Sequence, residues 1–440
     1  MTESSQSSRQ HGETRLPESH PNHTSARAGA AGLSGFSLRT PDGLHVILPP
    51  RWQASKLWGI YLQNVDCLIK VVHAPSMEKQ LYAAVSLTQD VAPTFLALIF
   101  SVFLAATISV SDATLSAIGL EKQSAMSSFK DGIQWCFSQL PLSQFSDLNM
   151  LQALVIYQIC SRSIGDCCSN WGLVSAALRE AEAGAPGARD GISRHANIEQ
   201  EIRQRLCWYI RSLDTTAAER SGLRSLRNSV ARSRIELPLH IGDEDFGTTG
   251  PLHLTENPGW KDATFCLVLF EIQKAKEEVL HRRSQIVAAG DKGLDAFMDC
   301  IRTHIQEKYL AHCDKNNPIQ LATVLFSKVL LGDLLMQAAQ TEVTDVAAGG
   351  EASWTGVQME TVLDALRTYN ELLTDEFFKS FRWYLKAFAP HTLINAALRQ
   401  VSESAASPIS TELWEAACQT LELSQIQQIF KPISLNDGIA

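Results

Sequence analysis

Residues 199–222 read EQEIRQRLCWYIRSLDTTAAERSG. Apolar residues recur here every three or four positions, which places them on one face of an α-helix. That face consists of Ile198, Ile202, Leu206, Tyr209, Ile210 and Leu213. On the opposite side, the acid–arginine pairs Glu199–Arg203 and Glu201–Arg205 are four residues apart, and each stabilises a surface helix by about 0.2–0.5 kcal/mol. The stretch therefore predicts an amphipathic helix docked on the surface of a larger helical protein.

Two residues of this helix, Trp208 and Asp214, are candidates for a functional role. Asp214 lies at the end of the apolar face and could be a general base. An unpaired buried carboxylate is costly, however, and such an aspartate more often pairs with an arginine or accepts hydrogen bonds from a helix start. We therefore predict that Trp208 is a wall and Asp214 an anchor inside a stack of helices, and that neither contacts a substrate.

The same region is rich in arginine. Eight arginines fall between positions 203 and 234, namely Arg203, Arg205, Arg211, Arg220, Arg224, Arg227, Arg232 and Arg234. Such a local basic patch could attract phosphate. It lacks interleaved aromatic residues after Tyr209 and has no groove-reading motif. We predict a solvated or partner-facing surface, without direct DNA contact.

Helical periodicity continues through most of the chain, whereas alternating strand patterns are almost absent. The predicted fold is all-α, with ten or more packed helices. Residues 1–40 are rich in Ser, Pro, His and Gly and predict a disordered tail. Residues 41–440 form the helical domain, with sub-boundaries expected near 183–196, 223–258 and 342–356, where glycine-rich or non-periodic sequence interrupts the pattern.

Two apolar segments make specific predictions near the N-terminus. A 3.6-residue period begins after Pro50 and continues to Val72, which predicts one long helix. Residues 91–111 contain no charge and are long enough to cross a bilayer. They also contain polar residues, among them Thr94, Ser101, Thr107 and Ser109, and no Lys or Arg at either edge sets an orientation. We interpret them as a helix buried on all sides, and we expect no membrane partner.

Composition limits the remaining function classes. The 440-residue chain is 45% hydrophobic with a net charge of -9, so it can form a sizeable core and has no overall attraction for nucleic acid. Its ten cysteines are spread among apolar neighbours, as reduced thiols of an intracellular protein are. The tightest group, Cys160, Cys167 and Cys168, has neither a CxxC spacing nor a nearby histidine, so no zinc site is expected.

Sequence motifs for catalysis are also missing. The chain has no GxSxG, no Walker loop, no dinucleotide fingerprint and no HExxH. Cys300, His304, Glu307 and His312 fall on one predicted helix, which we interpret as an ordinary mixed face. An aromatic helical stripe follows, and we favour core packing over a ligand cage for it. Its members are Phe377, Phe381, Tyr384, Leu385 and Phe388. A pocket, if the chain has one, is expected here, against the buried helix at 91–110. We predict no catalytic, cofactor-binding or metal-binding residues.

The helix predicted from the opening stretch, here called the signature helix, and the sequence after it resemble the fungal-specific transcription factor domain. This domain is the "middle homology" region of fungal zinc-cluster regulators. The matching residues are Glu201, Arg203, Arg205, Leu206, Trp208, Leu213, Asp214, Gly222, Leu237, Pro238 and Asp243 to Asp245. Upstream, residues 151–184 are similar to the family's paired helices through Leu151, Ala153, Leu154, Trp171, Ala176, Arg179 and Ala181. Residues 48–77 resemble its opening through Leu48, Pro49, Ala54, Leu57, Tyr61, Val65, His73 and Pro75.

Three features depart from the family pattern. Family members normally carry an N-terminal module with six cysteines in two CxxC pairs, which binds two zinc ions and reads DNA. Here the first cysteine is Cys67, so we expect this chain to lack that module. The turn after the signature helix reads SGLRSLRNS where the family has Gly-Arg-Pro, and GAPGARDG replaces the family's Gly-Leu-His-Arg-Asp element.

The resemblance implies a nuclear regulator of transcription that acts through its helical domain. The partners it implies are a second copy or a DNA-binding regulator, forming a homodimer or heterodimer, and a small-molecule effector. The alternative is a helical scaffold repurposed as an enzyme or small-molecule binder, because large helical folds can hold apolar pockets between helices.

Overall fold

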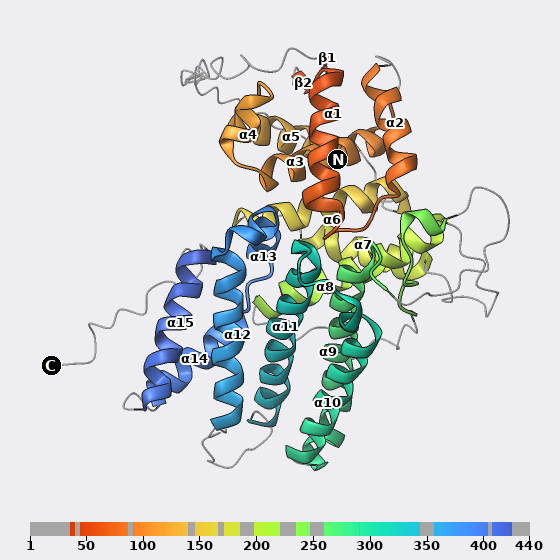
Figure 1. The fold of residues 1–440 in the computed structure, drawn as a ribbon. Coiled ribbons are helices and arrows are strands. Elements are labelled where there is room, and N and C mark those ends of the chain that lie inside the picture. The colour runs from red at the N-terminus through yellow and green to blue at the C-terminus, as the bar shows by residue number, and fades with distance from the viewer. Residues whose placement is uncertain are drawn as a thin grey trace, which may run out of the picture.

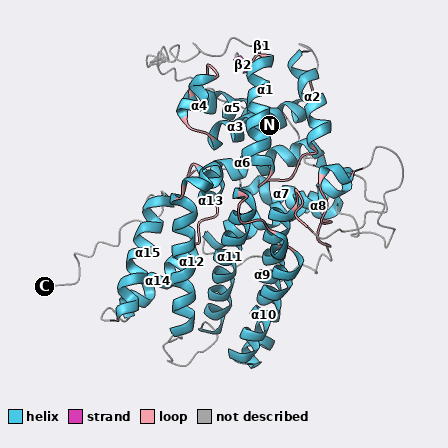
Figure 2. Ribbon diagram, in the orientation of Figure 1, coloured by secondary structure: helices cyan, strands magenta, loops and turns pink. Residues whose placement is uncertain are grey.

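The computed structural model describes residues 36–39, 45–86, 91–139, 146–165, 171–184, 198–220, 235–246, 259–289, 291–343, 356–403 and 407–424. These residues form fifteen α-helices, a few short 3-10 or π segments and one hairpin of two strands (Figures 1 and 2). The predicted all-α fold is confirmed. Much of the predicted tail, and most of the stretches proposed as sub-boundaries, lie outside the described residues.

The hairpin is the small exception to the helical pattern. Strand β1 (Phe36–Arg39) pairs antiparallel with β2 (His45–Leu48), and Phe36 lies opposite Leu48. The sequence analysis placed β1 in the tail. Each strand has only four residues, which is too short for an alternating pattern to predict it.

Five helices form the N-terminal body at the top of Figure 1. They are α1 (Arg51–Tyr61), α2 (Ala74–Ser86), α3 (Pro93–Ser109), α4 (Asp112–Ala117) and α5 (Lys122–Ser138). Helix α3 lies at the centre of this body and is buried almost all round, as the sequence predicted. It approaches α5 closely because Gly132 has no side chain, since a Cβ atom there would lie 2.9 Å from Cδ2 of Phe100.

Three helices cross the middle of the molecule and connect this body to the lower half. They are α6 (Leu148–Ser163), α7 (Trp171–Gly184) and α8 (Ile198–Arg220). The side chain of Asp147 caps α6 by accepting a hydrogen bond from the Met150 amide at 3.1 Å. Residues 235–246 then run mostly without regular structure and end in the 3-10 turn η4 (Asp243–Asp245).

The remaining helices run side by side in the lower half (Figure 1). They are α9 (Thr264–Ala289), α10 (Asp291–Lys308), α11 (Pro318–Val343), α12 (Gly356–Thr374), α14 (His391–Glu403) and α15 (Pro408–Ser424), with η5 (Leu310–His312), η6 (Glu376–Phe381) and α13 (Arg382–Ala387) between them. Buried Asn370 joins α12 to α15, because its amide donates to the carbonyl of Ala416 at 3.0 Å and its Oδ1 accepts from Thr420 at 2.8 Å. One contiguous core spans the upper and lower halves.

The predicted long helix up to Val72 is wrong beyond Asp66. Helix α1 ends at Tyr61, a π-helical turn η1 (Leu62–Asp66) follows, and the chain then leaves helical geometry. Two long-range hydrogen bonds from other helices hold the chain in this non-helical path. Tyr209 Oη donates to the Leu68 carbonyl at 2.7 Å, and Gln152 Nε2 donates to the Val71 carbonyl at 2.6 Å.

Among the described residues, one helical segment, Pro318–Ala339, is long and apolar enough to cross a membrane. In the 18-residue stretch of it that meets this criterion, 56% is buried inside the protein. Helix α3 is shorter, and its side chains form part of the core. A buried helix of a large bundle gives the same composition as a membrane span. Length and composition therefore assign neither helix to a membrane.

The aromatic stripe predicted for residues 377–388 is only partly correct. The segment is divided between η6 and α13, so Phe377 does not share a face with the others and is 41% exposed. Phe381, Tyr384 and Leu385 are buried as predicted. The chain turns at Asp375, whose carboxylate accepts a hydrogen bond from the Phe377 amide at 2.9 Å and so starts the tighter 3-10 turn.

Candidate functional site around helix α8

Helix α8 holds the extended segment 235–246 along its length. Trp208 Nε1 donates to the Glu236 carbonyl at 3.0 Å, and Gln204 Nε2 donates to the same oxygen at 2.7 Å. One turn earlier, Glu201 Oε1 accepts from the Leu239 amide at 2.9 Å. Residues 235–246 form no sheet or long helix that would pair their backbone groups. Side chains of α8 pair these groups instead and so hold the segment in place.

The pair Glu201–Arg205 is buried, which corrects the prediction of a surface pair. Glu201 is 3% exposed and Arg205 is 1% exposed. Arg205 Nε lies 3.4 Å from Glu201 Oε1, and its Nη2 donates to the Ile241 carbonyl at 3.4 Å. The segment 235–246 covers this face of α8, which the amphipathic pattern of α8 alone does not predict. Glu199 and Arg203 form the predicted exposed pair at 2.9 Å.

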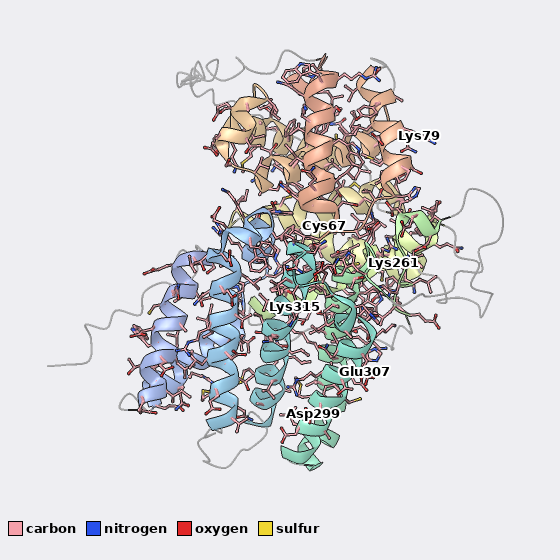
Figure 3. The ribbon with its side chains drawn as sticks, in the orientation of Figure 1. Cys67, Lys79, Lys261, Asp299, Glu307 and Lys315 are labelled. Carbon is pink, nitrogen blue, oxygen red and sulfur yellow. The ribbon has the colours of Figure 1, made fainter. Side chains whose placement is uncertain are left out.

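A second ion cluster lies where the end of η1 meets η4. The Lys70 ammonium is 2.6 Å from Asp66 Oδ2, 2.8 Å from Asp243 Oδ2 and 3.7 Å from Asp262 Oδ2. Burial by itself would lower the pKa of Lys70, but Asp66 and Asp243 outweigh it and raise that pKa. Burial raises the pKa of Asp66 to about 6, although Lys70 opposes the shift. Figure 3 shows neighbouring Cys67 and Lys261 in this region, where the N-terminal body meets the rest of the fold.

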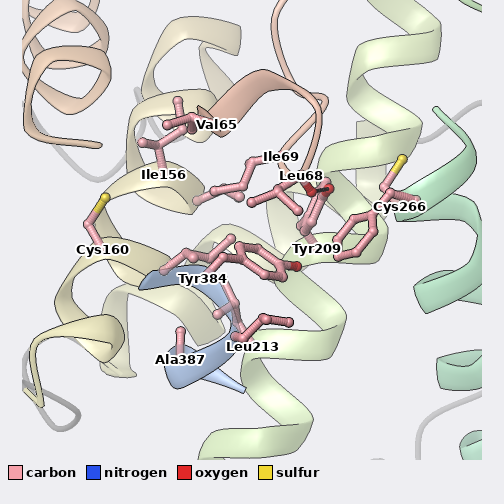
Figure 4. Close-up of a cluster of buried hydrophobic side chains, with 14 of the residues drawn as sticks. Val65, Leu68, Ile69, Ile156, Cys160, Tyr209, Leu213, Cys266, Tyr384 and Ala387 are labelled. Atoms are coloured by element: carbon pink, nitrogen blue, oxygen red, sulfur yellow. Dashed lines mark hydrogen bonds between the residues drawn. The ribbon is translucent and has the colours of Figure 1, made fainter. Parts of the chain in front are cut away.

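Tyr209 connects α8 to the segment that follows η1. Its ring packs edge-on against Phe270 with centroids 4.9 Å apart, and its hydroxyl bonds the Leu68 carbonyl. Figure 4 shows Tyr209 between Leu68 and Ile69 on one side and Tyr384 on the other. The signature helix thus contacts the N-terminal body and the C-terminal helices through one buried side chain.

Further along α8, Trp208 and Arg211 form the contact with α9. Trp208 is 2% exposed and stacks on Phe270 with ring centroids 6.1 Å apart. The Arg211 guanidinium lies 4.9 Å above the Trp208 ring, and its Nε donates to Glu277 Oε1 at 3.2 Å. Glu182 on α7 lies 3.6 Å from the same guanidinium. The predicted role of Trp208 as an internal wall is confirmed.

Asp214 is half-buried, and its Oδ1 accepts a hydrogen bond from Ser175 Oγ of α7 at 3.0 Å. A serine hydroxyl is thus one partner of this carboxylate, in addition to the kinds of partner that the sequence analysis considered. The contact ties α8 to α7, so Asp214 has the predicted anchoring role.

The arginine-rich surface is only partly described. Arg205 and Arg211 are buried and engaged with carboxylates, which corrects their assignment to a surface patch. Arg203 is half-exposed and donates to the Ser146 carbonyl at 2.9 Å. The other five arginines have side chains outside the described residues. The described arginines therefore stabilise the fold.

The remaining candidates of the sequence do not converge on a reactive site. Helix α10 ends at Lys308, so His312 belongs to η5 and not to the helix of Cys300, which corrects the prediction of one shared helix. His304 Nε2 lies 3.0 Å from Glu271 Oε1, which also accepts from Tyr309 Oη at 3.1 Å. In the described part of the chain, no group of three His, Cys, Asp or Glu residues could hold a metal ion. Cys160 is buried, and Cys167 and Cys168 lie outside that part.

Sequence reasoning missed the Lys70 cluster. Asp66 and Lys70 are four residues apart, which is the spacing of a helical ion pair, but they fall in a segment predicted to be an ordinary apolar helix. Their third partner, Asp243, is 173 residues away from Lys70. In the sequence, the only indication that Asp243 matters was its place in the acidic run Asp243 to Asp245, which matches the family motif.

The hydroxyl of Tyr209 allows a direct test of the bracing role. Replacing Tyr209 by phenylalanine removes its bond to the Leu68 carbonyl, and we expect the free energy of unfolding to fall by about 1–2 kcal/mol. Tyr384 is the matched control, because its fully buried hydroxyl has no hydrogen-bond partner among the described residues. Tyr384→Phe should leave stability unchanged or raise it. Equal losses in urea titrations of both variants would contradict the bracing role.

Comparisons with known proteins agree with this architecture. Residues 58–326 match the Fungal specific transcription factor domain. The chain is 24% identical over 398 residues to the aurofusarin cluster transcription factor aurR2 of Gibberella zeae, covering 88% of this chain and 58% of that protein. It is 24% identical over 395 residues to the transcriptional regulator AacuB of Aspergillus aculeatus, covering 88% and 52%.

A third relative, the transcriptional regulator nsrM of Aspergillus novofumigatus, is 23% identical over 381 residues, covering 85% of this chain and 52% of that protein. The chain thus spans about half the length of the curated relatives it matches. No solved structure gives a significant match. Because the domain match covers more than half of the chain and includes η1, α8 and segment 235–246, the chain belongs to the fungal-specific transcription factor domain family.

Proposed function

We propose that this chain regulates transcription in the nucleus and that its targets are genes of a secondary-metabolism cluster. The single observation that carries the proposal is the domain match over residues 58–326. The relatives' names support the narrower target class, since aurR2 is named for the aurofusarin cluster and another relative, from Pyricularia oryzae, for the pyriculol/pyriculariol biosynthesis cluster.

The proposed mode of action is non-catalytic. The polar side chains of the α8 network are engaged in holding neighbouring segments, as Trp208 and Glu201 hold the backbone of residues 235–246. Regulation would then act through the shape and the partners of the helical domain. We propose that the partner is a DNA-binding regulator of the same family or a second copy of this chain, that this chain makes no direct DNA contact, and that a small molecule serves as effector.

Deletion and re-expression in the native host test this function. Transcripts of one biosynthetic cluster should change on deletion and return with the wild-type chain, and a fluorescent fusion should accumulate in nuclei. Affinity purification of a tagged chain should recover a regulator with a DNA-binding module, or a second differently tagged copy. Unchanged transcripts together with exclusion of the fusion from nuclei would overturn the proposal. A metabolite that stabilises the purified chain against heat would identify the effector.

A further inference from the structure

The Lys70 cluster is unusual in its charge balance. One ammonium is shared by the carboxylates of Asp66, Asp243 and Asp262, at 2.6, 2.8 and 3.7 Å. Two other cations, Lys261 and Arg205, are engaged with other carboxylates, since Lys261 lies 3.1 Å from Asp245 and Arg205 lies 3.4 Å from Glu201. Carboxylates that crowd around a single cation repel one another, and one of them then binds a proton more readily than in water.

Asp66 is the member of this group best placed to take the proton. Asp262 has a side chain that is 53% exposed, so water stabilises its charge. Asp243 Oδ2 accepts hydrogen bonds from both the Ala74 amide, at 2.9 Å, and the Lys70 ammonium, at 2.8 Å. The side chains of Asp66 and Asp243 are 10% and 12% exposed, and the Oδ1 atom of each has no hydrogen-bond partner within the described residues. Asp66 differs from Asp243 because no backbone amide of the described residues donates to its Oδ2, which contacts Lys70.

The cluster lies at a joint of the fold. Asp66 ends the π-helical turn η1, Asp243 begins η4, and Asp262 precedes α9. The three carboxylates therefore come from segments that are distant in sequence, and Lys70 holds them together. Short π-helical turns are a departure from regular geometry that is frequent at functional sites.

We propose that this joint is a proton-dependent latch, in which protonation of Asp66 favours the closed arrangement and ionisation at neutral pH favours local opening. The direction follows from linkage. In the closed state Asp66 is desolvated and binds a proton more tightly than in an open, hydrated state, so acidification favours closure. Lys70 remains charged throughout, because its partners raise its pKa.

Cys67, Tyr61 and His73 are further titratable groups near the joint. Burial raises the pKa of Cys67 to about 12 and raises the pKa of Tyr61 well above its ordinary value, so both stay neutral at physiological pH. His73, whose Nδ1 lies 2.8 Å from Ser76 Oγ, is the exception. Burial lowers its pKa, so its protonation on acidification opposes closure. A test must therefore separate His73 from Asp66.

Hydrogen exchange of the full chain between pH 5 and 7.5 tests the latch. After correction for intrinsic exchange rates, the opening equilibrium of residues 66–76 and 236–246 should be about tenfold smaller at pH 5 than at pH 7.5 in a His73→Gln variant, given a closed-state pKa near 6 for Asp66. Residues 359–373 of α12 should show no such change. In the double variant Asp66→Asn/His73→Gln, the neutral carboxamide should keep the joint closed and abolish the pH dependence.

Two results would overturn the latch. One is a pH-independent opening equilibrium in His73→Gln, and the other is a dependence that persists unchanged in the double variant. If Asp66→Asn does not fold, the pH profile of the His73→Gln chain still decides the matter, because it requires the closing trend on acidification.

Discussion

Replacing Lys70 by methionine is expected to lower the free energy of unfolding by about 3–5 kcal/mol at neutral pH. The substitution preserves most of the buried aliphatic volume but leaves Asp66 and Asp243 without their shared counter-ion. Burying unpaired carboxylates is costly. The change should appear in urea denaturation followed by helical circular dichroism, as a shift of the midpoint.

Lys79 supplies the matched control for this experiment. It lies on the neighbouring helix α2 and is exposed (Figure 3), so Lys79→Met should change stability by less than about 0.5 kcal/mol. The loss in Lys70→Met should also shrink as the pH falls towards 5, because the stranded carboxylates then bind protons and lose their charge. A loss that equals the Lys79 control, or that does not vary with pH, would show that the cluster does not stabilise the joint.

The sequence alone was sufficient where local periodicity and burial coincide. Helix α3 was predicted as a helix buried on all sides, and the described structure places it at the centre of the N-terminal body. The apolar face of α8 was predicted correctly from Ile202 to Leu213. Each of these depends on contacts within one helix or on its hydrophobic content.

The errors share a different cause, which is that a distant segment competes with a local preference. Tyr209 and Gln152 bind carbonyls of residues 68 and 71 and hold the chain in a non-helical path where a helix was predicted up to Val72. Segment 235–246 covers Glu201 and Arg205, which turns a predicted surface pair into a buried one. The periodicity of a helix does not show which distant segment packs against it. The early end of the first helix and the burial of Glu201 and Arg205 therefore could not be predicted.

The family motif itself becomes intelligible from these contacts. Its members Glu201 and Trp208 bind the backbone of the segment around Pro238, and its acidic residue Asp243 binds Lys70 of the N-terminal body. Residues that are scattered in the signature are therefore neighbours in space. The motif describes a brace among α8, segment 235–246 and η1, which is consistent with a domain that works by holding a shape.

Trp208 gives the strongest test of that brace. We expect Trp208→Ala to lower the free energy of unfolding by about 3–5 kcal/mol, because it removes a buried indole and leaves a cavity beside Phe270. Trp208→Phe keeps most of the ring and loses mainly the hydrogen bond to the Glu236 carbonyl, so its cost should be about 1–2 kcal/mol.

The control for size and residue type is Trp414 on α15, which is 45% exposed. Trp414→Ala should cost less than about 1 kcal/mol, because nearly half of this residue is already exposed to solvent and its removal leaves no closed cavity. The brace also predicts which residues lose protection from hydrogen exchange first. Hydrogen exchange in Trp208→Phe should rise in residues 235–246 before it rises in α12, since the lost bond holds that segment and leaves the Asn370 contacts intact. A uniform rise in both regions would mean that Trp208 contributes to the general core and does not specifically hold this segment.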